Sequence, residues 1–146
     1  MAGGVRLMVF DFGFGPVRVD PINGWVERTF TYTPHVGMPV SLVSASGEER
    51  IVTDVGVFVS GVSPFGTVRR LLNEFALCIE VSKKIVVEGP LVSWPIDGGP
   101  LELAFPFHVG GGEELRVTVL SPTGLLSPPE LRMLVHLYGF HRPVVR

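Results

Sequence analysis

The sequence predicts an all-β protein, an antiparallel β-sandwich that forms a single domain. Three observations support this fold class. Short runs of alternating apolar and polar residues recur along the chain, which is the period of a strand with one buried face. The 18 glycines and 13 prolines are spread between these runs and disfavour long helices. No helical pattern separates the runs, so the crossovers that a parallel sheet needs are missing.

Length and composition limit the classes of protein that fit. The 146 residues suffice for one domain and are too few for two domains with full cores. Hydrophobic residues make up 46% of the chain and charged residues only 18%, so we expect apolar strand faces to remain once the core is filled. The net charge of -2 supplies no basic field and argues against binding of nucleic acid.

Several features bear on the setting of the protein. Cys78 is the only cysteine, which excludes an internal disulfide. The apolar stretch at the N-terminus is too short for a signal peptide, and no segment has the roughly 20 apolar residues of a membrane helix. We therefore expect no secretory export and no membrane span. The scarcity of Asn and Gln beside many prolines fits a heat-loving source, and a GC-rich genome would give the same bias.

Residues 1–24 form the first segment. Its aromatic residues alternate with acidic or small ones, at Phe10, Phe12 and Phe14. We expect an edge strand followed by a loop, or an extended arm whose rings a partner covers. The sandwich domain then spans residues 25–146.

Period-two alternation and β-branched residues predict the strands of this domain. Prolines, glycines and turn-rich stretches end them, with one strand stopping at Pro106 and the last ended by Gly139 and Pro143. The predicted strands are 25–33, 38–43, 51–60, 75–81, 85–87, 101–105, 114–119 and 131–138. Within the strand 101–105, the side chains of Leu101, Leu103 and Phe105 are expected to face one way. Residues 67–73 could form a short helix.

The strands 75–81 and 85–87 are joined by a tight turn at residues 82–84, so they are expected to be antiparallel neighbours. About eight to ten short strands at regular spacing are typical of a sandwich or barrel. The two architectures that fit are a jelly roll and an immunoglobulin-like sandwich, and we predict a jelly-roll-like sandwich for residues 25–146.

The second half of the chain carries a recognisable series of segments. They are EFALCIEVSKKIVVEGPL at 74–91, LAFPFHV at 103–109, ELRVTVLSPTG at 114–124 and LRMLVHLYGFHRP at 131–143. This series resembles the closing strands of single jelly-roll proteins of virus particles, especially those of tailed and membrane-containing bacteriophages. The resemblance covers about half of the chain and does not extend to its first 60 residues. It implies a minor capsid, cement or decoration subunit, made in the host cytoplasm and located in the virion, with no catalytic residues to transfer.

The residues that could carry chemistry do not form a known site pattern. The histidines His35, His108, His136 and His141 have no metal-ligand spacing, and the last two would share a strand face only with a bulge near Gly139. Cys78 is interpreted as a small side chain in a semi-buried site. The run 110–112 of glycines is interpreted as a turn between strands, because no helix follows it. We predict no catalytic residue, no cofactor and no metal, and therefore no enzyme.

Two functions remain. The first is a virion subunit that binds capsid proteins and copies of itself, as a dimer or trimer, through large apolar side chains. The residues expected at this interface are Phe10, Phe12, Phe14, Trp25, Trp94 and Tyr138. The alternative is a carbohydrate-binding or receptor-binding sandwich, in which Trp25 and Trp94 would stack on a sugar. A cupin-type or hydrolytic enzyme ranks last, because its metal-ligand spacing is missing.

Overall fold

The structure is a computed structural model of the whole chain, and it describes residues 8–13, 15–34, 40–43, 47–60, 73–95, 97–121 and 132–143. Antiparallel strands dominate these residues, which confirms the predicted all-β sandwich. No helix in the described part of the chain is long and apolar enough to span a membrane. Of the predicted helix at 67–73, only Asn73 lies among the described residues, and it is helical together with Glu74.

The described residues form ten strands and two short 3-10 helices. The strands are β1 (Met8–Asp11), β2 (Pro16–Val19), β3 (Val26–Tyr32), β4 (Val40–Val43), β5 (Glu48–Ser60), β6 (Ala76–Val81), β7 (Lys84–Pro90), β8 (Leu101–Val109), β9 (Glu114–Leu120) and β10 (Arg132–Pro143). The helices are η1 (Pro21–Asn23) and η2 (Leu91–Ser93).

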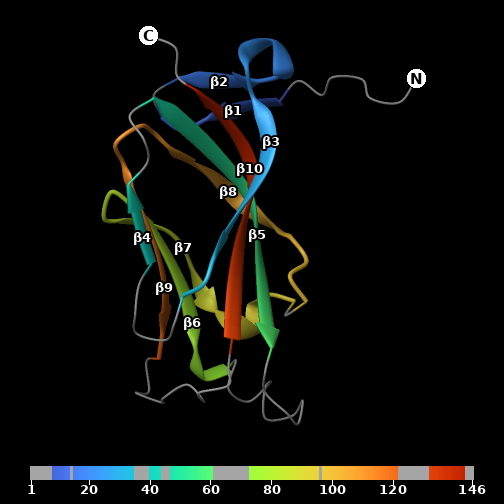
Figure 1. Cartoon of the computed structure of the whole chain (residues 1–146), viewed down its shortest axis with the longest axis vertical. Helices are drawn as coiled ribbons and strands as arrows, with labels where there is room; N and C mark the ends of the chain where they lie inside the picture. The colour runs from blue at the N-terminus through green and yellow to red at the C-terminus, as the bar shows by residue number, and fades with distance from the viewer. Residues whose placement is uncertain are drawn as a thin grey trace, which may run out of the picture.

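Two four-stranded sheets make up the sandwich, with strand orders β3-β10-β5-β8 and β4-β9-β6-β7. Every described pair of neighbouring strands is antiparallel (Figure 1). The pairing is nested: β3 pairs with β10, β4 with β9, β5 with β8 and β6 with β7. Successive strands therefore alternate between the sheets except at β6 and β7, as if one long antiparallel hairpin had been rolled up.

The innermost pair is the predicted hairpin of β6 and β7. Ser82 and Lys83 connect the two strands with φ angles of 50° and 69°. Two adjacent residues with positive φ are typical of a type I′ turn, whose twist matches that of the flanking strands. Lys84, which was expected in the turn, is the first residue of β7 and lies opposite Val81.

The main core lies between the two sheets, and alternate residues of each strand supply it. Its fully buried members include Val55, Val57, Val135 and Leu137 from one sheet and Leu77, Ile79, Val117 and Val119 from the other, each at most 1% exposed. Burial of each such side chain contributes about 1.5–3 kcal/mol. The sandwich therefore rests on the period-two pattern from which it was predicted.

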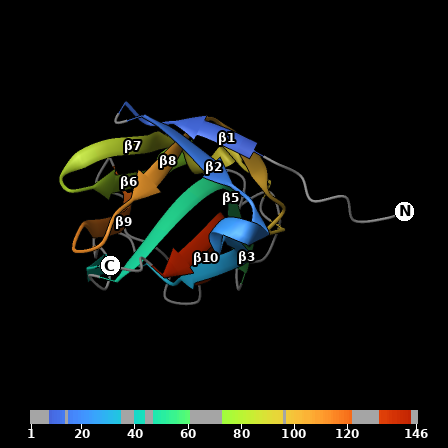
Figure 2. The same ribbon diagram turned by 90° about the horizontal axis from the view of Figure 1, so that it is seen from above.

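A second apolar cluster lies on the opposite face of the first sheet, where the β1–β2 hairpin covers one end (Figure 2). Val52 belongs to the main core, whereas its neighbour Ile51 points away and packs with Trp25 and Val19. Met8, Phe10, Phe12, Val17 and Phe140 complete this cluster. β1 and β2 thus form a two-stranded sheet of their own, and side chains of the chain itself cover much of their apolar surface.

The predicted end of β8 is wrong, because the strand continues through Pro106 to Val109. β10 continues through Gly139 and ends at Pro143, the second of the two residues expected to end it. Pro106 is tolerated because β8 is an edge strand and this part of it is not paired. Gly139 is needed where it lies, since a Cβ atom there would be 1.9 Å from the carbonyl oxygen of Ile51.

Candidate binding groove

A groove of about 630 Å³ lies at the open side of the sandwich. Its walls come from β7 and β8, the edge strands of the two sheets, which lie on the same side of the molecule (Figure 2). The tip of the β1–β2 hairpin borders it as well. The apolar lining residues are Phe12, Val81, Val86, Ala104, Phe105, Pro106 and Phe107, and the polar ones are Asp11, Ser82, Lys84, His108 and Glu113.

An irregularity in β8 shapes one wall of the groove. β8 pairs with β5 at Glu102, which lies opposite Asp54, and pairs again at Phe107, which lies opposite Val52. Four residues of β8, at 103–106, therefore face the single residue Thr53 of β5. Such a bulge bends the strand and redirects its side chains.

The bulge exposes an aromatic ring. The side chain of Phe105 is 84% exposed, whereas Phe107 is 5% exposed in the core. The alternation of the sequence had placed Phe105 on one face with Leu101 and Leu103, and this expectation is wrong because the bulge breaks the alternation. The ring now stands beside the apolar walls of the groove.

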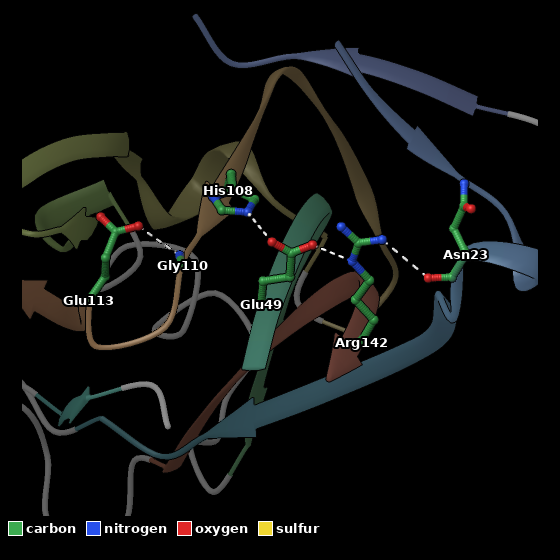
Figure 3. A network of polar contacts seen from close by, with 6 residues as sticks. All are labelled: Asn23, Glu49, His108, Gly110, Glu113 and Arg142. Atoms are coloured by element: carbon green, nitrogen blue, oxygen red, sulfur yellow. Dashed lines mark hydrogen bonds and ion pairs between the residues drawn. The ribbon is translucent and has the colours of Figure 1, made fainter. Parts of the chain in front are cut away.

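A network of polar contacts fixes one end of the groove (Figure 3). Glu49 of β5 lies between two neighbours: its Oε2 atom is 3.2 Å from Nε2 of His108, and its Oε1 atom accepts a hydrogen bond from Nε of Arg142. Arg142 also donates from Nη1 to the backbone oxygen of Asn23, at 3.2 Å. The side chains of Glu49 and His108 are only 15% and 13% exposed. One carboxylate thus joins β5, β8 and β10, and His108 presents its ring to the groove from a fixed position.

Glu113 orders the same end of the groove from the turn between β8 and β9. Its Oε1 atom accepts a hydrogen bond from the backbone N–H of Gly110 at 2.7 Å, and its Oε2 atom accepts one from the hydroxyl of Ser82 at 2.9 Å. The glycine run 110–112 is therefore an inter-strand turn, as predicted. Both oxygens of Glu113 thus accept hydrogen bonds from within the chain, which fixes its carboxylate at this end of the groove.

The other residues that were considered for metal binding or catalysis, the remaining histidines and Cys78, do not form a common site among the described residues. His136 shares a hydrogen bond of 2.8 Å with the hydroxyl of Thr31, and Nε2 of His141 is 3.5 Å from Glu48. Among the described residues, no group of three His, Cys, Asp or Glu side chains is placed to hold a metal ion. Cys78 is buried, and this burial, together with Glu80 and Glu88, raises the pKa of its thiol. His35 lies outside the described residues.

The two tryptophans predicted at a partner interface are not on the surface. Trp25 is 3% exposed and Trp94 is 7% exposed. The β1–β2 hairpin covers the ring of Trp25, and the ring of Trp94 packs into the main core. Neither ring can therefore present a face to a partner or a sugar, which corrects this part of the prediction.

The remaining predicted interface residues have different environments. Phe10 is half-buried against the cluster of Trp25, and Tyr138 is half-buried with its hydroxyl donating to the backbone oxygen of Gly98 at 2.7 Å. Phe12 is half-buried and lines the groove, its ring centroid 5.5 Å from that of His108. Phe14 lies outside the described residues. Phe12 is thus the one of these residues that the structure brings to the groove.

Sequence reasoning missed Phe105 and the network of Glu49. The Phe-Pro step at 105–106 was a usable signal, because proline inside a strand pattern marks an edge strand or a bulge.

Comparisons with family models, with curated proteins and with solved structures found no match to this chain.

Proposed function

We propose that this protein is a structural subunit of a virus particle, a capsid or capsid-decorating subunit that binds its neighbours through the β7–β8 edge. The observation that carries the proposal is the nested pairing of strands β3 to β10. Nested pairing of eight strands in two sheets is the strand order expected of a jelly roll, the fold of many viral capsid domains, and it therefore supports the proposal. Lectin domains and cupins share this fold, so the site has to decide between these functions.

The groove favours adhesion between proteins. Its lining is mostly apolar, and an aromatic ring that is 84% exposed stands beside it. Burial of a phenylalanine contributes about 1.5–3 kcal/mol, which corresponds to roughly a tenfold to hundredfold gain in affinity. A partner that covers Phe105 would therefore bind measurably through this one residue.

The carbohydrate-binding alternative has less support. It depended on Trp25 and Trp94 as a stacking platform, and both rings are buried. Tyr32 is buried and Tyr138 is half-buried, so neither replaces them as an exposed stacking ring. The exposed ring at the groove is Phe105, a single ring beside a lining that is mostly apolar.

Density-gradient sedimentation of lysate from the natural source, probed with an antibody against the chain, tests the proposal. We expect the protein to sediment with particles and electron microscopy of those fractions to show it on a shell. A chain found only in particle-free fractions, combined with binding on a glycan array, would support the carbohydrate-binding alternative and overturn the proposal.

A further inference from the structure

We propose that the β7–β8 groove binds a second copy of this chain, with Phe105 of each copy inserted into the groove of the other around a two-fold axis. The inference uses the same adhesive edge as the proposed function and names its occupant. In a two-fold interface the same patch faces itself, so each patch must carry both halves of every contact. The β7–β8 edge meets this condition in shape and in charge.

The shape is self-complementary because a protruding ring and an apolar recess adjoin one another. Phe105 projects from the bulge of β8, while Val86, Ala104 and Pro106, which are exposed or half-buried, form apolar parts of the lining beside it. The volume of about 630 Å³ lies in the range of grooves that enclose small organic groups, so one phenyl ring fits. A copy turned by 180° brings its own Phe105 to this recess.

The charges of the lining are also self-complementary. Lys84 lies on the β7 side, whereas Asp11 and Glu113 supply negative charge to the same groove. Lys84 is exposed and has no ion-pair partner among the described residues. Asp11 accepts a hydrogen bond from the backbone N–H of Gly13. Across a two-fold axis the ammonium of each copy can approach a carboxylate of the other, whereas a patch of one sign would repel itself.

The bulge favours contact through side chains over joining of two sheets. An edge strand with free backbone groups can pair with another chain, and proline or a bulge prevents this. β8 carries both at residues 103–106, next to Phe105. Edge-to-edge strand pairing is therefore disfavoured at this part of β8, and a partner has to bind through contact with the ring of Phe105.

Sedimentation equilibrium of the full chain measures the inferred association. We expect a dimer whose dissociation constant rises at least tenfold with Phe105→Ala, which removes the ring, and with Lys84→Trp, which fills the groove from β7. Ile22→Ala is the matched control, because Ile22 is 90% exposed on η1 and does not line the groove. Lys84→Ala removes the charge without filling the groove, and we expect a change of about fivefold or less.

The decisive experiment mixes the two variants that are expected not to dimerise, Phe105→Ala and Lys84→Trp. Phe105→Ala retains an intact groove and Lys84→Trp retains an intact Phe105, so an equimolar mixture can form one of the two contacts. We expect the mixture to form heterodimers more tightly than either variant forms homodimers. Far-ultraviolet circular dichroism and thermal melting of each variant establish that it is folded.

Three results would separate the inference from the proposed function. A wild-type chain that stays monomeric, or a mixture that associates no better than its components, overturns the exchange of Phe105. If that monomer still sediments with particles, the proposed function stands without the inference. If the chain forms the Phe105-dependent dimer and never sediments with particles, the inference stands and the proposed function fails.

Discussion

The strand β5 has an irregular register at Thr53 with both of its neighbours, and the two flanks, toward β10 and toward β8, differ in structure. On the β10 flank, Tyr138 lies opposite Asp54 and the next residue, Gly139, lies opposite Val52, so Thr53 is a single extra residue. On the β8 flank, the same two residues of β5 lie opposite Glu102 and Phe107, with four residues between them. On the β10 flank, the inner one, the two strands stay close together at the irregularity. On the β8 flank, the outer one, the strand bulges away toward solvent.

The difference follows from what surrounds each flank. β10 lies between β3 and β5, so its backbone has no room to move away, and glycine permits the close approach to Ile51. β8 has no further strand beyond it, so its backbone can leave the ladder and carry Phe105 outward. A bulge in the interior of a sheet thus constrains the sequence, and a bulge at its edge creates a feature that can bind.

The largest expected effect is that of Gly139→Ala. The new Cβ atom would lie 1.9 Å from the backbone oxygen of Ile51 and 3.0 Å from the Cα atom of Val52, and backbone atoms cannot move aside cheaply. We expect a loss of about 3 kcal/mol or more in the free energy of unfolding, or failure to fold.

Chemical denaturation of this variant beside Gly47→Ala provides the measurement. A Cβ atom at Gly47 meets nothing within 4 Å, so the control should stay within about 0.5 kcal/mol of wild type. A loss below about 1 kcal/mol for Gly139→Ala would show that the inner flank is not closed.

An intermediate effect is expected for Glu49→Ala. Glu49 contacts His108 of β8 and Arg142 of β10, so it joins both neighbours of β5 beyond the irregularity at Thr53. Its removal leaves two half-buried polar side chains without this partner, and we expect a loss of about 1–3 kcal/mol.

Glu48→Ala is the matched control for this variant. The side chain of Glu48 is 37% exposed, and its contacts with Arg50 and His141 are longer, at 3.9 and 3.5 Å. We expect a change of about 1 kcal/mol or less. Equal losses for the two variants, measured by denaturation, would argue against a special role for the network of Glu49.

Local pattern predicted most of the fold, because alternation and β-branching are properties of adjacent residues. β3, β5, β9 and the β6–β7 hairpin all lie within about three residues of their predicted ranges. The bulge at Thr53 could not be found in this way, since the pattern of one strand does not record which strand will pair with it. Pro106 was therefore interpreted as an end, although it lies inside β8.

The site was less predictable than the fold for the same physical reason. Which aromatic rings become covered depends on long-range packing, as the burial of Trp25 under the β1–β2 hairpin shows. The network of Glu49 joins residues 59 and 93 positions away in the chain. Among the predicted interface residues that the structure describes, only Phe12 lies at the groove.

The smallest expected effect on stability is that of Pro106→Ala, which tests the outer flank directly. Residue 106 has no partner in the β5–β8 register, so the N–H that alanine restores is not required for pairing, and none of the existing ladder is lost. The variant should lose only the restriction that proline places on the unfolded chain, about 0.4–1 kcal/mol by denaturation. Phe105-dependent association should persist, because residues 103–106 of β8 still lie opposite the single residue Thr53 of β5. A loss above about 2 kcal/mol would show instead that the pyrrolidine ring holds the bulge open, making the outer flank as constrained as the inner one.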